Sequence, residues 1–238
     1  MATAAPFYTI QGSRRCMLCL MVVAALGALC ASGCASWVPW KDKDKIARET
    51  AKYGATADQR IQELQEQAKV AKAADGERQA LFTQELIRKT LEEHDPRVRS
   101  ELVAIAATFD TPSAKAICKG GLEDPDERVR MKACEVWRRR GGDEAVQLLA
   151  ARYRTDSELD VRLRALRMLG ELENKAAIPV LAKALEDPDP AVQYRAVASL
   201  KKVSGRDLGD DVNKWRAWAA DPNAAESWSI AETFRKLF

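Results

Sequence analysis

The sequence predicts an all-α protein, an α-solenoid in which antiparallel helix pairs stack side by side. One unit recurs every 31 or 32 residues, with its valine at Val98, Val129, Val161 and Val192. Each unit carries two apolar stripes at helical spacing, and turn-forming residues separate the stripes. Since one helix pair cannot bury both of its stripes alone, neighbouring pairs must stack to form a continuous core.

The stripes define two helices in each unit. The first stripe follows the repeat valine, as in Ala165, Leu166, Met168 and Leu169 after Val161. The second stripe is shorter and comes later in the unit. These spacings predict four units over residues 95–209, namely 95–123, 124–155, 156–186 and 187–209.

Turn residues mark where the helices begin and end. Aspartate precedes proline at 95–96, 124–125 and 187–188, which predicts an N-cap followed by proline in the first helical turn. Thr111-Pro112 predicts the same start for a second helix. Glycines at 120–121, 141–142 and 170 predict left-handed residues at helix C-termini.

The two ends of the array differ from its middle. Residues 57–94 predict N-terminal capping helices and half a repeat, because their apolar stripe is interrupted at Asp75-Gly76. Residues 210–238 predict C-terminal capping helices rich in tryptophan. We expect these tryptophans, Trp215, Trp218 and Trp228, to fill the core rather than to form a ligand cage.

The repeats resemble bacterial HEAT repeats of the short kind that is also found in bilin lyases. The resemblance rests on the Asp-x-x-x-x-Val-Arg start, the alanine four residues after the valine, and Ala177-Ile178-Pro179-Val180-Leu181. In that family aspartates and arginines often form a ladder along the stack. Here the resemblance implies a structural ladder of Asp95, Arg99, Asp124, Arg130, Asp156, Arg162 and Asp187.

Two departures from the family pattern affect the ladder. Gln193 stands where arginine is expected, which predicts an interruption in the last unit, and the first unit has two fewer residues between Asp95 and Val98. We expect each rung to lie on a partly exposed ridge and to contribute roughly 0–1 kcal/mol. On that view, replacing Arg130 alone would barely change function.

The N-terminal segment predicts export. Arg14-Arg15 precede an apolar run over residues 16–30 and then Ala31-Ser32-Gly33-Cys34. The last four residues resemble the lipobox of bacterial lipoproteins, which implies a signal peptide at 1–33, a lipid on Cys34 and a tether over 34–56. The protein would then be a membrane-anchored lipoprotein of the cell envelope, on the outer membrane and facing the periplasm if the cell has two membranes. The alternatives are an ordinary signal cut near Ala35 or an uncleaved anchor.

The net charge of the chain limits the class of partner, and the cysteines leave two alternatives for the core. The chain has 38 Lys+Arg and 35 Asp+Glu, and removal of residues 1–33 takes away two arginines and leaves a net charge of +1. A nearly neutral chain does not predict a polyanion-binding protein. We interpret Arg138-Arg139-Arg140 as a solvated helix end. Outside residues 1–34 the cysteines are Cys118 and Cys134. They could form a disulfide, or they could be two free thiols buried in the core.

The sequence does not predict an enzyme. His94 is its one histidine, and it has no apparent nucleophile, second histidine or glycine-rich phosphate loop beside it. No catalytic, cofactor-binding or metal-binding residue is expected. We expect a non-catalytic adaptor whose groove, lined by second-helix residues, binds a protein or peptide, with no nucleic acid or small-molecule substrate. The alternatives are a chromophore-handling enzyme like the bilin lyases and, less favoured, a nucleic-acid-binding helical-repeat protein.

Overall fold

The computed structural model describes residues 43–221, which fall into two compact units divided between Ala55 and Thr56. The described part of the first unit is one helix, α2 (Lys43–Tyr53). Helix α2 lies within residues 34–56, for which the sequence predicts a tether. Its residues are good helix formers, and Lys45 pairs with Glu49 one turn later, at 4.0 Å. The predicted signal peptide and Cys34 lie outside the described residues.

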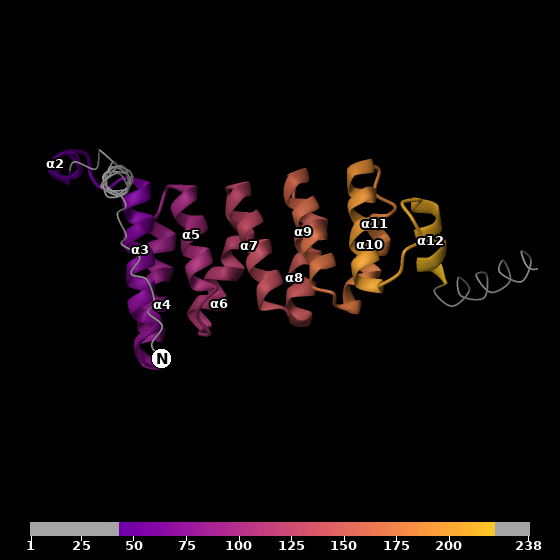
Figure 1. The fold of residues 1–238 in the computed structure, drawn as a ribbon, viewed down its shortest axis with the longest axis horizontal. Coiled ribbons are helices and arrows are strands. Elements are labelled where there is room, and N and C mark those ends of the chain that lie inside the picture. The colour runs from indigo at the N-terminus through magenta and orange to yellow at the C-terminus, as the bar shows by residue number, and fades with distance from the viewer. Residues whose placement is uncertain (1–42, 222–238) are drawn as a thin grey trace, which may run out of the picture. The chain divides into compact units, whose positions relative to one another are not determined.

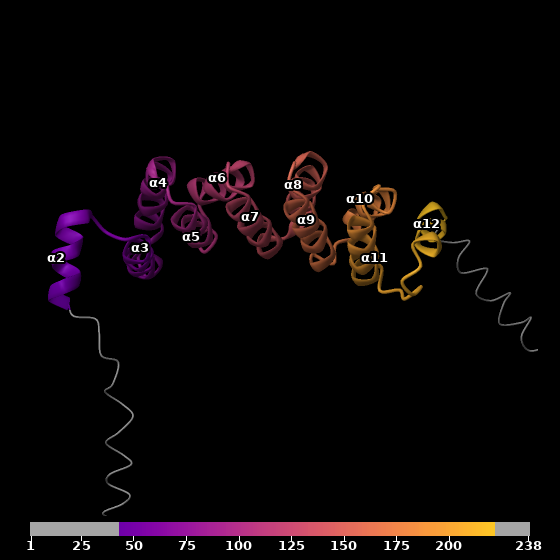
Figure 2. The same ribbon diagram turned by 90° about the horizontal axis from the view of Figure 1, so that it is seen from above.

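The second unit contains two rows of helices, and residues 43–221 include no strand (Figures 1 and 2). Each helix of the first-helix row packs on the next one, and in the second-helix row α4 packs on α6 and α10 packs on α12, which confirms the prediction of an all-α solenoid. The first-helix row is α3 (Ala57–Lys72), α5 (Pro96–Ala106), α7 (Glu127–Arg140), α9 (Leu159–Glu171) and α11 (Pro190–Ser204). The second-helix row is α4 (Gly76–Glu92), α6 (Pro112–Gly120), α8 (Gly142–Thr155), α10 (Ile178–Ala184) and α12 (Val212–Ala220). Two short 3₁₀ turns, η1 (Gly121–Glu123) and η2 (Lys175–Ala177), join the rows.

The core lies between the two rows. The four repeat valines are each 0–1% exposed, so they occupy equivalent environments in successive units. The described buried hydrophobic residues run from Ala57 to Trp218, all within the second unit. The core of the described residues is therefore complete without residues 1–55, and we expect residues 56–238 to fold on their own.

The tryptophans near the end of the array fill this core, as predicted. Trp215 and Trp218 are 0% and 4% exposed, and their rings meet edge to face with centroids 5.5 Å apart. The Trp215 Nε1–H donates to the Gly209 carbonyl at 2.9 Å. Trp228 lies outside the described residues.

The ends of the array continue its two rows. Helix α3 packs on α5 while α4 packs on α6, so the α3–α4 pair sits at the head of both rows. At the other end α12 packs on α10 and α11. The rest of the predicted C-terminal cap, residues 222–238, lies outside the described residues.

Two of the predicted helix starts are confirmed. Asp95 caps α5 and Thr111 caps α6, each followed by proline. The predicted caps Asp124 and Asp187 are wrong, because the caps are Asp126 for α7 and Asp189 for α11.

Glycine serves two different purposes in the array. Gly141 and Gly142 have φ of 71° and 77° at the α7–α8 junction, which confirms the prediction of a left-handed turn there. The prediction for Gly120, Gly121 and Gly170 is wrong, and Gly121 has φ of −60°. Gly120 has φ of −58°, and Gly170 lies inside α9, where an added Cβ would come within 2.6 Å of Ser199 on α11. Gly170 thus permits close packing of neighbouring first helices.

Candidate binding groove and charged ladder

A ladder of ion pairs joins each of the first helices α3, α5, α7 and α9 to the loop that precedes the next first helix. We call each ion pair a rung. The arginine–carboxylate distance is shorter in the two middle rungs than in the two outer ones, and every rung except the last is bidentate. The shortest arginine–carboxylate distances are 3.1 Å for Arg60–Glu93, 2.8 Å for Arg99–Asp124, 2.9 Å for Arg130–Asp156 and 3.8 Å for Arg162–Asp187.

Each acidic member also fixes its own loop. Its carboxylate accepts the backbone N–H of the residue two positions later, at 2.8–3.0 Å. The arginines reach back as well: Arg130 Nη1 donates to the Asp124 carbonyl at 2.9 Å. One guanidinium therefore holds two successive loops at a fixed separation.

The first rung corrects the predicted ladder, because its acid is Glu93 rather than Asp95. Asp95 caps α5 and pairs with Arg97 at 3.1 Å. Glu93 stands five residues before Val98, which is the spacing of every other acidic member from its valine. That spacing was the signal for Glu93. It also explains why the first unit has two fewer residues between Asp95 and Val98.

The central rung is buried, which corrects the expectation of a partly exposed ridge. Arg130 and Asp156 are each 9% exposed. A second arginine, Arg152 from α8, approaches the same carboxylate at 3.2 Å and donates to the Leu122 carbonyl. Desolvation raises the pKa of Asp156, but hydrogen bonds from Arg130 and the Glu158 N–H, with the arginine charges, bring the pKa below its usual value.

At Gln193 the described ladder ends. Gln193 Nε2 donates to the Asp187 carbonyl at 2.7 Å, as Arg130 does to its own loop. A neutral amide cannot continue the series of ion pairs. The last acidic member, Asp187, instead accepts a further hydrogen bond from the Tyr153 hydroxyl at 3.2 Å.

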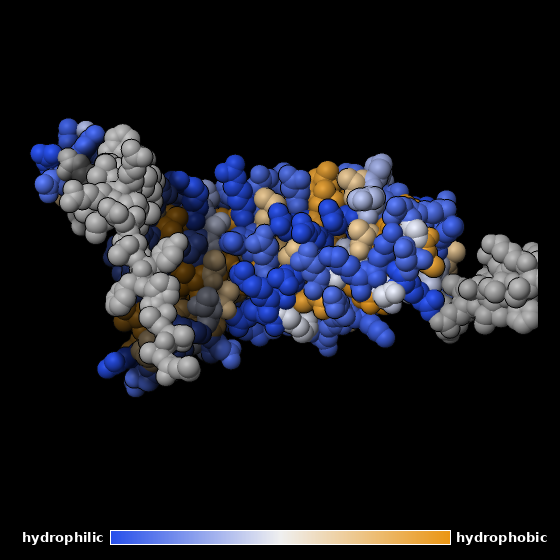
Figure 3. Space-filling model, viewed as in Figure 1, coloured by the Kyte–Doolittle hydropathy of each residue, from blue (hydrophilic) through white to orange (hydrophobic). Residues whose placement is uncertain are grey.

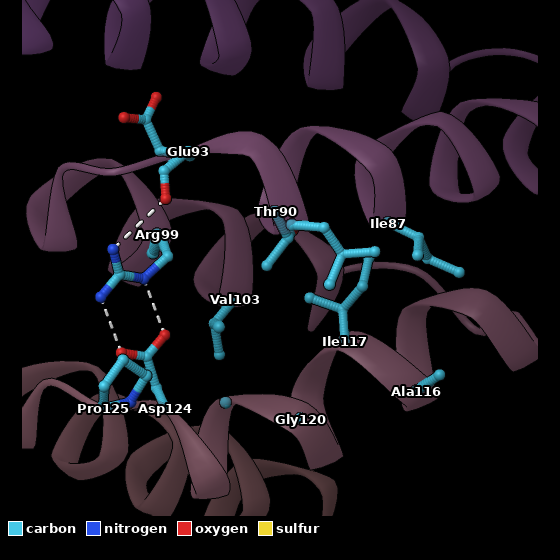
Figure 4. Close-up of a pocket in the computed structure, with 12 residues that line it drawn as sticks. Ile87, Thr90, Glu93, Arg99, Val103, Ala116, Ile117, Gly120, Asp124 and Pro125 are labelled. Carbon is cyan, nitrogen blue, oxygen red and sulfur yellow. Dashed lines mark hydrogen bonds and ion pairs between the residues drawn. The ribbon is translucent and has the colours of Figure 1, made fainter.

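An apolar groove opens between α4 and α6 of the second-helix row (Figure 4). Its volume is about 390 Å³. One side is lined by Ile87 and Ile117, and the ladder pair Arg99–Asp124 closes the other side. The groove is open at Ala116 and Gly120 because their side chains are small. Leu91, which also lines the groove, is 81% exposed. The groove thus offers apolar surface beside an ion pair whose charges already satisfy one another.

A family model described as HEAT repeats matches residues 83–165 and 153–226. The chain is a HEAT-repeat protein. A comparison with curated proteins gave no match.

The matched segments of this HEAT-repeat protein include the groove and most of the ladder. They begin within α4 and extend past α12, so they contain Glu93, Leu91 and every later rung. Arg60, on α3, precedes the matched residues and extends the ladder by one rung.

The histidine and the two cysteines that the sequence analysis considered lie in ordinary structural environments of the HEAT-repeat protein. His94 is exposed between α4 and α5, and its carbonyl accepts a hydrogen bond from Arg99 at 2.8 Å. Cys118 and Cys134 are free and buried, and burial raises the pKa of Cys134 to about 12. Within residues 43–221, no three His, Cys, Asp or Glu side chains gather in a way that would hold a metal ion. None of the helices in this range has the length and apolarity needed to span a membrane.

Proposed function

We propose that this HEAT-repeat protein is a non-catalytic scaffold, lipid-anchored at the bacterial cell envelope, that binds a protein or peptide in the α4–α6 groove. The observation that carries the proposal is an exposed apolar groove on a rigid, ladder-braced array. Exposed contiguous apolar surface on a folded protein marks an interaction site. The groove also lies on the second helices, where the sequence predicts binding.

The chemistry of the groove favours binding over catalysis. Its charged and hydroxyl side chains are Thr90, Glu93, Arg99 and Asp124, and each already has a partner. Arg99 and Asp124 form a bidentate pair at 2.8 Å. Glu93 pairs with Arg60 at 3.1 Å, and the Thr90 hydroxyl donates to the Leu86 carbonyl at 2.7 Å. The remaining side chains of the lining are apolar, and among them Leu91 is exposed and Ile87 is partly exposed. Such a surface suits an amphipathic segment that inserts apolar side chains.

The anchor is proposed from the N-terminal sequence. Ala31-Ser32-Gly33-Cys34 after a basic and apolar leader supports cleavage before Cys34 and acylation of that cysteine. Acyl chains on one N-terminal residue hold a protein at a bilayer without a membrane-spanning helix. The scaffold would then hold its partner at the membrane surface.

The Cys34→Ala variant tests the anchor. Mass spectrometry of the wild-type chain is expected to find an N-terminal acylated Cys34, and the protein is expected in the membrane fraction. The variant is expected to lose the lipid and to leave the membrane fraction after its leader is cut elsewhere. A wild-type chain that begins at Ala35, or that keeps its leader, would contradict the lipid anchor.

A matched pair of variants on α4 tests the groove. Leu91 lines the groove, whereas Leu81 lies outside the groove lining and is 61% exposed. Both side chains are exposed, so glutamate at either position leaves the fold intact. We expect Leu91→Glu to weaken capture of the partner from envelope extracts at least tenfold, since a charge enters an apolar contact, and Leu81→Glu to capture normally. Equal capture by both variants would remove the groove from the proposal.

A further inference from the structure

The surface of the first-helix row carries an excess of positive charge over α7, α9 and α11. Five cations there share two carboxylates. Glu171 pairs with Arg167 at 2.9 Å, Arg138 at 3.4 Å and Lys202 at 3.8 Å. Glu135 pairs with Arg164 at 2.9 Å and with Lys132 at 3.6 Å. We name these five cations and two acids the basic face.

More cations lie on the same helices. Arg128, Arg139 and Arg195 form no ion pair within the described part of the chain, and Asp160 is a further exposed acid on α9. Members of the basic face recur three or ten residues after the repeat valine, as Lys132, Arg164, Glu171 and Lys202 do, and these offsets share one side of a helix. The helical repeat itself therefore gathers the charge on one side of the array.

This charge is accessible to solvent. The side chains of Arg167 and Lys202 are 52% and 53% exposed, and Arg138 is 37% exposed. The whole chain is nearly balanced, with 38 Lys+Arg against 35 Asp+Glu, so the excess reflects segregation of charge rather than composition. The near-neutral net charge, which argued against an anionic partner, does not describe this face.

The character of the face distinguishes between anionic partners. Protein interfaces depend on a few buried aromatic or aliphatic anchors. The surface seen in Figure 3 is mostly hydrophilic over α7 to α11, and the large exposed hydrophobic residue on these helices is Tyr194. A bilayer that contains acidic lipids needs no such anchor, because it attracts spread lysines and arginines through its surface potential.

We infer that the basic face docks on the headgroups of anionic phospholipids. The inference deepens the proposed function, which brings the chain to a membrane, although the charge arrangement is independent of Cys34. The two rows lie on opposite sides of the second unit (Figure 2). Docking through the first-helix row therefore leaves the α4–α6 groove open on the side away from the membrane.

Vesicle binding by residues 56–238 tests the inference. This unit contains its own core and lacks Cys34, so the result does not depend on lipidation. The probes are vesicles of phosphatidylcholine with phosphatidylglycerol, and vesicles of phosphatidylcholine alone. We expect sedimentation with the anionic vesicles only, and we expect added salt to abolish it, since screening shortens the range of these charges.

A charge-matched pair of double variants locates the surface. Arg138→Glu with Arg167→Glu is expected to weaken binding to anionic vesicles roughly tenfold or more. Lys115→Glu with Lys183→Glu makes the same charge change on α6 and α10 of the second-helix row and is expected to bind like the wild type. Circular dichroism checks folding. If the first variant is unfolded, Arg138→Gln with Arg167→Gln replaces it, with a smaller loss expected.

Three results would overturn the inference: equal binding by both double variants, equal binding to neutral and anionic vesicles, or binding to polyglutamate in preference to the vesicles. The last result would assign the face to an acidic protein. Absence of lipid on Cys34, in contrast, would contradict the anchor and leave the vesicle result unchanged.

Discussion

The Leu166→Asp variant is expected to lose the folded middle of the array. Leu166 is fully buried in α9, and its carbonyl accepts the Ser199 hydroxyl of α11 at 2.9 Å. An aspartate there would place an unpaired carboxylate in an apolar core, which costs several kcal/mol out of a total domain stability of about 5–15 kcal/mol. Thermal melting followed by circular dichroism is expected to show a much lower midpoint or no cooperative transition.

Leu81→Asp is the matched control for that substitution. Leu81 is 61% exposed on α4, so its carboxylate stays in water and the melting curve should remain close to that of the wild type. A native melting curve for Leu166→Asp would contradict the placement of Leu166 in the core.

The Asp156→Asn variant is expected to lower the free energy of unfolding at pH 7 by about 3–5 kcal/mol. The Asp156 carboxylate pairs with both Arg130 and Arg152, and all three residues are at most 9% exposed. Its loss leaves the buried Arg130 guanidinium without a counter-charge and leaves Arg152 with the exposed Glu123 at 3.2 Å. Urea unfolding of residues 56–238 measures the change. Asp110→Asn is the control, because Asp110 is fully exposed beside Arg140 and should change little.

The pH dependence of the Asp156 contribution has a definite sign. The pKa of Asp156 in the folded protein lies below its ordinary value of 3.8. A lowered pKa stabilises the fold fully above the ordinary value, and this stabilisation disappears as the pH falls through the folded pKa. The difference between wild type and Asp156→Asn should therefore be constant near neutral pH and shrink below about pH 4. A difference that persists unchanged in acid would contradict the ion-pair assignment.

Periodicity made the fold predictable. Spacings of 31 or 32 residues between the repeat valines placed them at equivalent buried positions, and the structure confirms those positions. The ladder was predicted less well, because Asp95-Pro96 matches the Asp-Pro pairs of the later units and so indicated Asp95 as the acidic member. What is the same in every unit is the spacing of five residues between the acidic member of the ladder and the repeat valine, and this spacing identifies Glu93.

Features that depend on unlike neighbours were not predictable from the repeat. Arg152 reaches Asp156 and Leu122 from α8, but its contact appears in no pattern that the units share. The groove exists where Ala116 and Gly120 happen to leave space opposite α4. The basic face was hidden because Arg138-Arg139-Arg140 has the appearance of a solvated helix end, whereas Arg138 pairs across to α9.

Crosslinking from position 91 of the anchored chain tests most directly whether the groove is a binding site. A photoreactive amino acid replaces Leu91 in one preparation and Leu81 in another, and both positions lie on α4 with exposed side chains. We expect a discrete protein or peptide adduct from position 91 and none from position 81. Adducts from both positions alike, or from position 81 alone, would contradict a scaffold that holds its partner between α4 and α6.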